Sequence, residues 1–323
     1  MTVEAVFAYP RLLRTLPRYR WWKPLVAVLL LGALVLAATV VVALIALLAA
    51  IALGQVRVDT LGHLQQDVLA WQRLDASSPF ALFVALASVA VMLPFGALAY
   101  LCLGLRPVGV LSSVALRLRW RWMLACLGPA AVAIVVPLAV QLGVGALSGQ
   151  ALSPVTTPPA TLAVCLALVV LLVPVQAAAE EVVFRGVLVQ ALGSWIRWTP
   201  LPLVIPQALF VAAHTQYVSW GLVSVAMFGL TAAWLVWRTG GLEAGIALHT
   251  VNNVVSFALL SSGVLGTTVN DDAGGSWLDG LVTVVTMAGY ALWIDRMARR
   301  RGLATRREIP TPREYPEPVP TSP

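Results

Sequence analysis

The chain has 323 residues, of which 60% are hydrophobic and only 11% are charged. A soluble globular domain carries about a quarter charged residues, so a water-soluble fold of this length could not bury so much apolar surface. The composition therefore excludes an ordinary soluble enzyme and indicates a polytopic membrane protein. The three cysteines lie far apart in apolar stretches, which argues against a disulfide framework or a thiolate metal site.

Apolar runs of membrane-spanning length predict an all-α, polytopic transmembrane helix bundle of about eight spans. The first run is too long for a signal-peptide core and lacks a small-residue cleavage site, so we expect it to remain as an anchor. The fifth is short, and we expect its helix to begin near Pro206 because a proline is tolerated in the first turn. The predicted spans are 25–53, 80–104, 122–147, 161–184, 206–218, 220–237, 243–263 and 278–294.

The basic residues predict how these spans are oriented. With eight spans, all of the 21 lysines and arginines except Arg57 and Arg73 fall on the side that holds both termini. The positive-inside rule then places both termini in the cytoplasm. The net charge of +7 is therefore a topology signal, and we expect no nucleic-acid partner.

We divide the chain into four parts by composition. A basic cytosolic segment is followed by three transmembrane helices, by a membrane domain that holds nearly all the titratable residues within the spans, and by a basic, then proline-rich tail that should be disordered. An excess of arginine over lysine and a high alanine content suggest a bacterial cell membrane as the location. The parts are residues 1–24, 25–147, 148–296 and 297–323.

Ionisable side chains within the predicted spans gather in one stretch of the chain. Each costs roughly 2.5–3.5 kcal/mol at the centre of a membrane helix, so those that are present need a reason. Glu180 and Glu181 lie in the fourth span, His214 in the fifth and His249 in the seventh. Their position between residues 180 and 253 makes this stretch the candidate functional site.

The spacing of these residues separates their expected roles. Glu181 and Arg185 are four residues apart, so they share a helix face and can form an ion pair. Glu180 is turned about 100° from Glu181 and is left without that partner. A carboxylate in an apolar setting that is not neutralised by an arginine is suited to act as a general base.

The same spacing of four residues recurs on two further helices. Phe210 can pack beside the imidazole of His214, and His249 and Asn253 present an imidazole and an amide on one face. With Glu180, these groups could bind and activate a water molecule and then stabilise an oxyanion.

These residues carry a family resemblance. The run EEVVFR at 180–185 fits EExxxR, FVAAH at 210–214 fits FxxxH, and HTVNN at 249–253 fits HxxxN, in that order. The set resembles the CPBP family (CAAX prenyl protease and bacteriocin-processing, also called Abi), whose members are multi-helix intramembrane endopeptidases. The resemblance covers about residues 160–265.

The resemblance implies a role for each matched residue. Glu180 and His214 would activate the attacking water, and His249 and Asn253 would hold it and polarise the scissile carbonyl. Glu181 and Arg185 would be structural, with Phe210 as packing. Asn252 is a competing amide, but it is three residues from His249 rather than four.

Activation of the water by a bound metal ion is an alternative to activation by glutamate alone. Glu180, His214 and His249 could form a zinc site, but EExxxR lacks the HExxH spacing that places two imidazoles on one helical face. Asparagine is also a poor zinc ligand, so we prefer a glutamate-activated water without a cofactor.

Depth adds a constraint on this site. If the fifth helix begins at Pro206, His214 lies about 12 Å and His249 about 9 Å below the cytoplasmic side, at 1.5 Å per residue. Glu180 would lie near the cytoplasmic end of its helix, so the three could meet in a cavity open to the cytoplasm. A helix beginning at Leu201 would place His214 too deep.

The sequence therefore predicts an intramembrane endopeptidase in the lipid bilayer that cleaves membrane-associated peptides or proteins. The resemblance suggests lipidated tails, precursors or leader peptides as substrates. Two alternatives remain open: a proton-coupled transporter that uses Glu180 and the two histidines, and a non-catalytic membrane scaffold or immunity protein.

Overall fold

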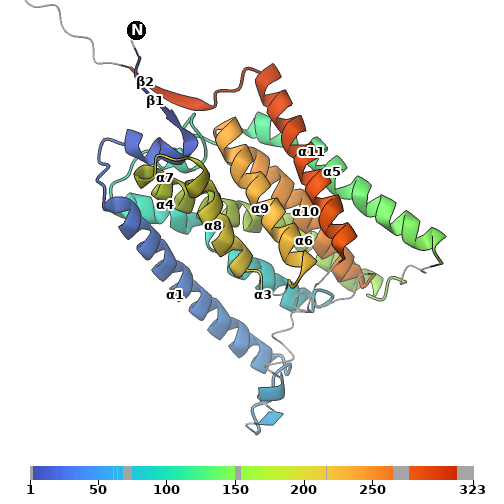
Figure 1. Ribbon diagram of the computed structural model, residues 1–323. Coiled ribbons are helices and arrows are strands. Elements are labelled where there is room, and N and C mark those ends of the chain that lie inside the picture. Colours follow the sequence, from blue (N-terminus) through green and yellow to red (C-terminus); the bar gives the residue numbers. More distant parts are fainter. Residues whose placement is uncertain are drawn as a thin grey trace, which may run out of the picture.

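A computed structural model describes residues 3–60, 62–63, 65–67, 75–149, 154–215, 217–264 and 276–310. It confirms the predicted helical membrane bundle, and Figure 1 shows its helices running side by side. Among the described residues, seven helical segments are long and apolar enough to cross a membrane. They are α1 (Lys23–Ala52), α3 and α4 (Pro79–Ala90 and Leu93–Cys102), α5 (Trp120–Leu147), the segment Pro159–Trp195, α9 (Trp220–Thr239), α10 (Glu243–Ser262) and α11 (Trp277–Arg300).

The fifth predicted span is a shorter helix that begins earlier than expected. It is α8, Pro200–Ala212, so the predicted start at Pro206 and the predicted end at 218 are both wrong. The first turn of a helix has no hydrogen-bonding use for its N–H groups, which allows Pro200 and Pro202 to lie inside it. His214 therefore follows the helix instead of lying within it.

The fourth span continues well beyond its predicted end at residue 184. Helix α6 (Pro159–Glu180) passes into a π-helical segment, η3 (Glu181–Leu188), and then into α7 (Val189–Trp195). Glu180 therefore lies inside a continuous 37-residue helical segment and not near its cytoplasmic end, which corrects that prediction. Apolar residues lie on both sides of Glu181 and Arg185, and the ion pair between these two residues keeps their charges neutralised within the helix.

The two ends of the described chain meet at one end of the bundle. Strand β1 (Val3–Ala8) pairs antiparallel with β2 (Arg306–Pro310), as Figure 1 shows. We call this the basic end, since α1 and α5 start there and α11 finishes there next to the arginine runs. That this end faces the cytoplasm stays a prediction.

Parts of both terminal segments are ordered. The predicted disordered tail begins instead with the last turn of α11 and with β2, whereas residues 311–323 lie outside the described residues. Near the N-terminus, the short helix η1 (Tyr9–Thr15) buries Tyr9, Leu12 and Leu13 in an apolar cluster with the loop around η2 (Val108–Leu111).

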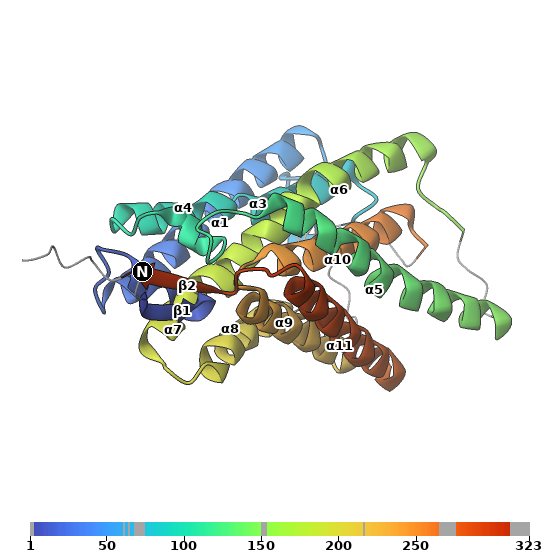
Figure 2. The same cartoon turned by 90° about the horizontal axis from the view of Figure 1, so that it is seen from above.

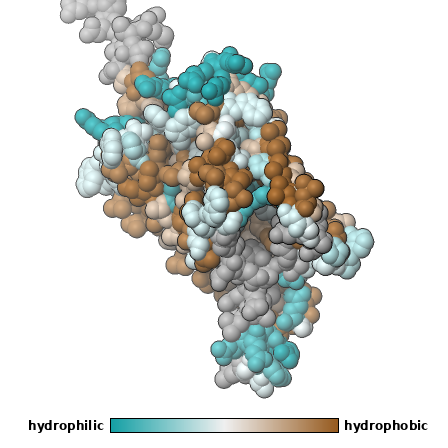
Figure 3. All heavy atoms as spheres, turned by 45° about the vertical axis from the view of Figure 1, so that its right-hand side comes forward, coloured by the Kyte–Doolittle hydropathy of each residue, from teal (hydrophilic) through white to brown (hydrophobic). Residues whose placement is uncertain are grey.

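Helix α10 lies at the centre of the bundle. Viewed from above in Figure 2, it is enclosed by α5, α6 and α9, and it packs against all three. Residues Glu243–His249 of α10 are buried. Figure 3 shows hydrophobic residues in a band across the helices, with hydrophilic residues at the basic end and at the opposite tip. The first half of the helix that carries the last predicted motif is thus shielded from the surroundings.

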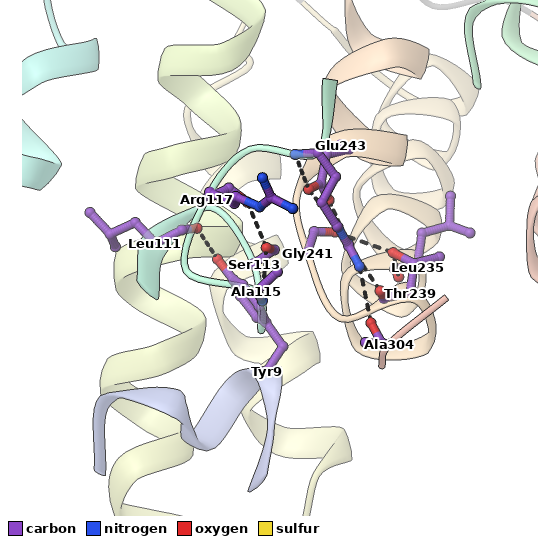
Figure 4. Close-up of polar contacts among 11 residues, drawn as sticks. Tyr9, Leu111, Ser113, Ala115, Arg117, Leu235, Thr239, Gly241, Glu243 and Ala304 are labelled. Atoms are coloured by element: carbon purple, nitrogen blue, oxygen red, sulfur yellow. Dashed lines mark hydrogen bonds and ion pairs between the residues drawn. The ribbon is translucent and has the colours of Figure 1, made fainter. Parts of the chain in front are cut away.

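A buried ion pair fixes the first turn of α10. The backbone N–H and Nε of Arg119 donate to Glu243 Oε1 at 2.9 and 2.8 Å, and its Nη2 donates to Oε2 at 2.7 Å. The same guanidinium donates to the carbonyl oxygens of Thr239 and Ala304, each at 3.0 Å. Figure 4 labels Glu243, Thr239 and Ala304, the partners in these contacts, and it shows the hydrogen bond from the Tyr9 hydroxyl to the Leu111 carbonyl. The arrangement, which we call the Arg119 clamp, ties α10 to α5, α9 and the segment before β2.

Candidate active site

The structure brings the three sequence motifs together around α10. Glu180 ends α6 and Glu181 begins η3, while His249 and Asn253 lie on α10. Phe210 lies on α8, and its ring centroid is 6.2 Å from that of His249. The π-helical segment starts at Glu181, and such segments occur frequently at functional sites.

His249 lies between the two glutamates. Its Nδ1 is 2.9 Å from Glu181 Oε1, and its Nε2 is 3.3 Å from Glu180 Oε2. Consecutive helical residues point about 100° apart, so the two carboxylates straddle the helix face toward α10 and each meets one ring nitrogen. Because His249 is only 2% exposed, protein groups alone set the orientation of its ring.

Glu181 does more than form the predicted structural ion pair. The pair itself is present, with Arg185 Nη1 at 3.0 Å from Glu181 Oε1 and both side chains fully buried. The same oxygen also accepts from His249 Nδ1, a contact that spacing within one helix could not reveal. Gly245 permits this approach, since a Cβ at that position would lie 2.8 Å from Glu181 Oε2. Glu181 therefore holds His249 in place.

Glu180 has a neighbour that the sequence interpretation missed. Gln176 Nε2 donates to Glu180 Oε1 at 2.9 Å, whereas the spacing argument had considered only an ion pair with Arg185 for this residue. Asn253 Nδ2 donates in turn to Gln176 Oε1 at 2.9 Å, and Asn252 Nδ2 donates to Asn253 Oδ1 at 3.0 Å. The four-residue spacing of Gln176 and Glu180 was a signal that could have found this amide. The chain of amides fixes one carboxylate oxygen and leaves the other beside His249.

Phe210 packs against the imidazole of His214, as predicted. The ring centroids are 4.3 Å apart, and the guanidinium carbon of Arg185 lies 4.2 Å from the Phe210 centroid. His214 Nδ1 is 2.7 Å from the Phe210 carbonyl oxygen. Because a carbonyl only accepts, Nδ1 donates in this contact, and in the neutral imidazole Nε2 then keeps a free lone pair. His214 is thereby set up as a proton acceptor.

The depth objection to His214 is removed by the longer fourth helix. Glu180 lies 15 residues before Trp195, or about 22 Å at 1.5 Å per residue. His214 follows a helix that begins at Pro200, which places it about 20 Å along by the same measure. The expectation that such a start would place His214 too deep is wrong, because Glu180 lies equally deep.

Two cavities meet at these residues. The larger, of about 660 Å³, is lined by Glu180 and by apolar residues of α1 and α3. The smaller, of about 410 Å³, is lined by His249 and by residues of α5, α9 and α11. Both cavities reach the site, so it borders open space on two sides. The residues that line both are His214, Tyr217, Asn252, Asn253 and Ser256.

Unpaired polar atoms are concentrated at this site. Glu180 Oε2, Glu181 Oε2 and two nitrogens of Arg185 are buried without a hydrogen bond in the described part of the chain. Native proteins pair the large majority of such atoms, and each exception requires an explanation. The oxygen of Glu180 that faces His249 is thus left available for a further group.

The donor set does not fit the metal alternative. Within the described ranges, no three His, Cys, Asp or Glu residues are arranged to hold a metal ion. His249 turns both ring nitrogens toward carboxylates, and His214 Nδ1 is bound to a backbone carbonyl. We therefore derive no step through a metal, and metal dependence stays a question for experiment.

Comparison with known proteins confirms the family resemblance over part of the chain. Residues 160–255 match the family model described as type II CAAX prenyl endopeptidase Rce1-like. This range runs from α6 into α10 and contains all three motifs. The match supports a membrane peptidase of the CAAX protease kind in this segment.

A curated relative adds no function of its own. "Uncharacterized protein YyaK" of Bacillus subtilis (strain 168) is 27% identical over 153 residues, or 42% of this chain and 50% of the relative. The chain thus spans about half the length of this relative. No solved structure matches the chain.

Proposed function

We propose that the chain is an intramembrane endopeptidase that hydrolyses peptide bonds of membrane-associated peptides with a water molecule activated by Glu180 and His214. The observation that carries the proposal is the unpaired Glu180 Oε2, which lies 3.3 Å from His249 Nε2 on the wall of a cavity that His214 also lines. A carboxylate with one fixed oxygen and one free oxygen can bind a water molecule and accept its proton.

In this mechanism the water oxygen attacks the scissile carbonyl carbon as its proton passes to Glu180 Oε2. His214 Nε2 orients the water as a second acceptor. Asn253, through its amide N–H, and His249, when Nε2 is protonated, donate to the carbonyl oxygen as negative charge develops on it. Glu180 then returns the proton to the leaving amine, the carbon–nitrogen bond breaks, and the enzyme is restored.

The surrounding residues hold these groups in place. Gln176 orients the Glu180 carboxylate, and Glu181 fixes the ring of His249. Arg185 neutralises Glu181 and lies over the Phe210 ring, which also packs against His214. This mechanism uses all three motifs and assigns Glu181 a positioning role toward His249.

The proposal includes a location and a substrate class. We place the protein in the bacterial cell membrane with its basic end in the cytoplasm, because the arginines gather there. The substrates would be membrane-associated precursors, leader peptides or lipidated tails, since the larger cavity joins the site to apolar walls.

Comparative peptidomics tests the proposal. Membranes from cells that express wild type or Glu180→Gln at matched levels are analysed for peptides by mass spectrometry. We expect cleavage products that occur only with the wild type and that persist after treatment with a zinc chelator. Coincident profiles from folded, abundant proteins would contradict hydrolysis and favour the scaffold alternative.

A further inference from the structure

The smaller cavity extends beyond the site along a wall of polar residues that the mechanism does not use. Gln141 of α5, Ser224 of α9, and Asp279, Thr283 and Thr286 of α11 line it. Polar side chains at membrane depth are costly and usually face a water-filled space or a ligand. Three separate helices therefore contribute polar groups to one cavity for which catalysis gives no reason.

This wall lies in the half of the bundle away from the basic end. Ser224 and Asp279 are within the first two turns of α9 and α11, two helices that run toward the basic end. Gln141 is in the last two turns of α5, which runs the other way. The cavity thus leads from His249 and Asn252 to the opposite end of the bundle.

One negatively charged side chain lies on this wall: Asp279, which forms the capping box of α11 with Ser276. Asp279 accepts from the backbone N–H and the hydroxyl of Ser276, both at 2.7 Å, and from the amide of Gln141. All of these donors are neutral, and no cation is paired with Asp279 in the described part of the chain. A carboxylate in a partly enclosed cavity attracts a positive group more strongly than it would in bulk water.

The two cavities differ in chemistry on the two sides of the site. Apolar residues such as Val28, Leu31 and Leu86 line the larger cavity, and the polar wall lines the smaller one. A chain that crosses the shared residues His214 and Asn253 would therefore have an apolar side and a polar side.

We propose that the smaller cavity is a subsite for a polar peptide segment that carries a lysine or arginine, whose charge pairs with Asp279. This inference rests on the proposed function for the identity of the ligand as substrate. It defines a two-part substrate: an apolar segment lies toward α1 and α3, and a cationic segment lies toward α11.

Cysteine labelling tests the subsite without relying on catalysis. In full-length protein in liposomes, Cys102, Cys126 and Cys165 are replaced by serine and Thr283→Cys is introduced. We expect a cationic trimethylammonium methanethiosulfonate to react about fivefold faster than an anionic sulfonate analogue, since one unit charge acts nearby. Asp279→Asn should abolish the preference for the cationic reagent. The control is Val285→Cys: this position is exposed on the outside of α11, where lipid would surround it, so it should react with neither charged reagent. An unreactive Thr283→Cys or an absence of charge preference would overturn the proposal.

Protection by peptides tests the identity of the occupant. In the Thr283→Cys, Glu180→Gln protein, a peptide with a leucine-rich half and a Ser-Lys-Ser half should slow labelling about threefold or more by occupying the cavity. Its Ser-Glu-Ser counterpart should not, and equal protection by the two would contradict the subsite. Cleavage of the lysine peptide by the Glu180 protein is measured separately, so a failure of hydrolysis would count against the proposed function alone.

Discussion

Two buried glutamate–arginine pairs hold α10, and they differ in how completely their polar atoms are paired. In the Arg119 clamp, both oxygens of Glu243 accept hydrogen bonds from Arg119, which also donates to two carbonyls. In the site, Glu181 and Arg185 are both fully buried, whereas Arg119 is partly exposed, yet Glu181 Oε2 and two nitrogens of Arg185 have no hydrogen bond. A buried polar atom without a partner costs about 1–3 kcal/mol.

The comparison distinguishes an ion pair that stabilises the fold from one that belongs to the candidate active site. A fully paired network rigidifies the fold, and the Arg119 clamp does this at the start of α10. Six residues further along the same helix, His249 meets the incompletely paired cluster. The same cluster includes Glu180 Oε2, which also lacks a hydrogen bond, and we infer that this oxygen is left unpaired because the site needs a carboxylate that is free to bind water and substrate.

The largest expected effect is on stability, from removing either arginine. Arg185→Met or Arg119→Met leaves a buried glutamate charge without its partner, which should cost about 3–5 kcal/mol of unfolding free energy. Changing Arg185 to Met and Glu181 to Leu together should recover much of that loss, because no charge is then buried. Denaturant titration in detergent micelles gives these values, and a single variant as stable as the wild type would show that the pair is not desolvated.

The next effect concerns the amides and separates the two neighbouring asparagines. Asn253→Ala should lower the cleavage rate about 10²–10³-fold, as removal of an oxyanion donor does. Asn252→Ala removes the outer member of the amide chain and should cost about tenfold by loosening Asn253. Initial rates on a substrate found by peptidomics give both values. A larger effect at Asn252 would exchange the two assignments.

A glycine substitution tests the positioning role of Glu181. In Gly245→Ala the new Cβ would lie 2.8 Å from Glu181 Oε2, which forces the carboxylate away from His249. We expect the rate to fall about 10²-fold, as for a displacement of about 1 Å near a reacting group. Gly289→Ala on α11 is the matched control, since nothing lies within 4 Å of its added Cβ. Equal rates for the two variants would argue against this role.

The smallest effect should come from the supporting region alone. Tyr9→Phe removes one hydrogen bond to the Leu111 carbonyl and should cost about 1 kcal/mol of stability. The cleavage rate should stay unchanged, because η1 does not line either cavity. Thermal unfolding and a rate assay on the same preparation check both parts, and a lower rate would mean that the basic end is coupled to the site.

Much of the fold and part of the site could be predicted from the sequence. Seven of the eight predicted spans contain long helices, because apolar length controls membrane insertion. The motifs identified Glu181–Arg185 and Phe210–His214 correctly, since a spacing of four residues fixes contacts within one helix or its final turn.

Neither the contacts between different helices nor the positions of the helix ends could be predicted in this way. The hydrogen bond from His249 to Glu181 joins residues 68 apart in sequence, and spacing within a helix carries no information about it. The early start of α8 depends on prolines that are tolerated in a first turn. The continuation of the fourth span past Glu181 depends on an ion pair that neutralises the charge within the helix. The pairing of β2 with β1 also depends on a long-range contact.

One measurement tests most directly whether the unpaired carboxylate serves catalysis and not folding. Purified wild type, Glu180→Gln and Glu243→Gln are assayed in the same liposomes for cleavage and for thermal unfolding. We predict that Glu180→Gln loses cleavage by about 10³-fold while its melting temperature stays the same or rises. Glu243→Gln should instead lose stability, because the Arg119 clamp loses its charge. Retained cleavage in Glu180→Gln, or a fall in its melting temperature equal to that of Glu243→Gln, would contradict the account.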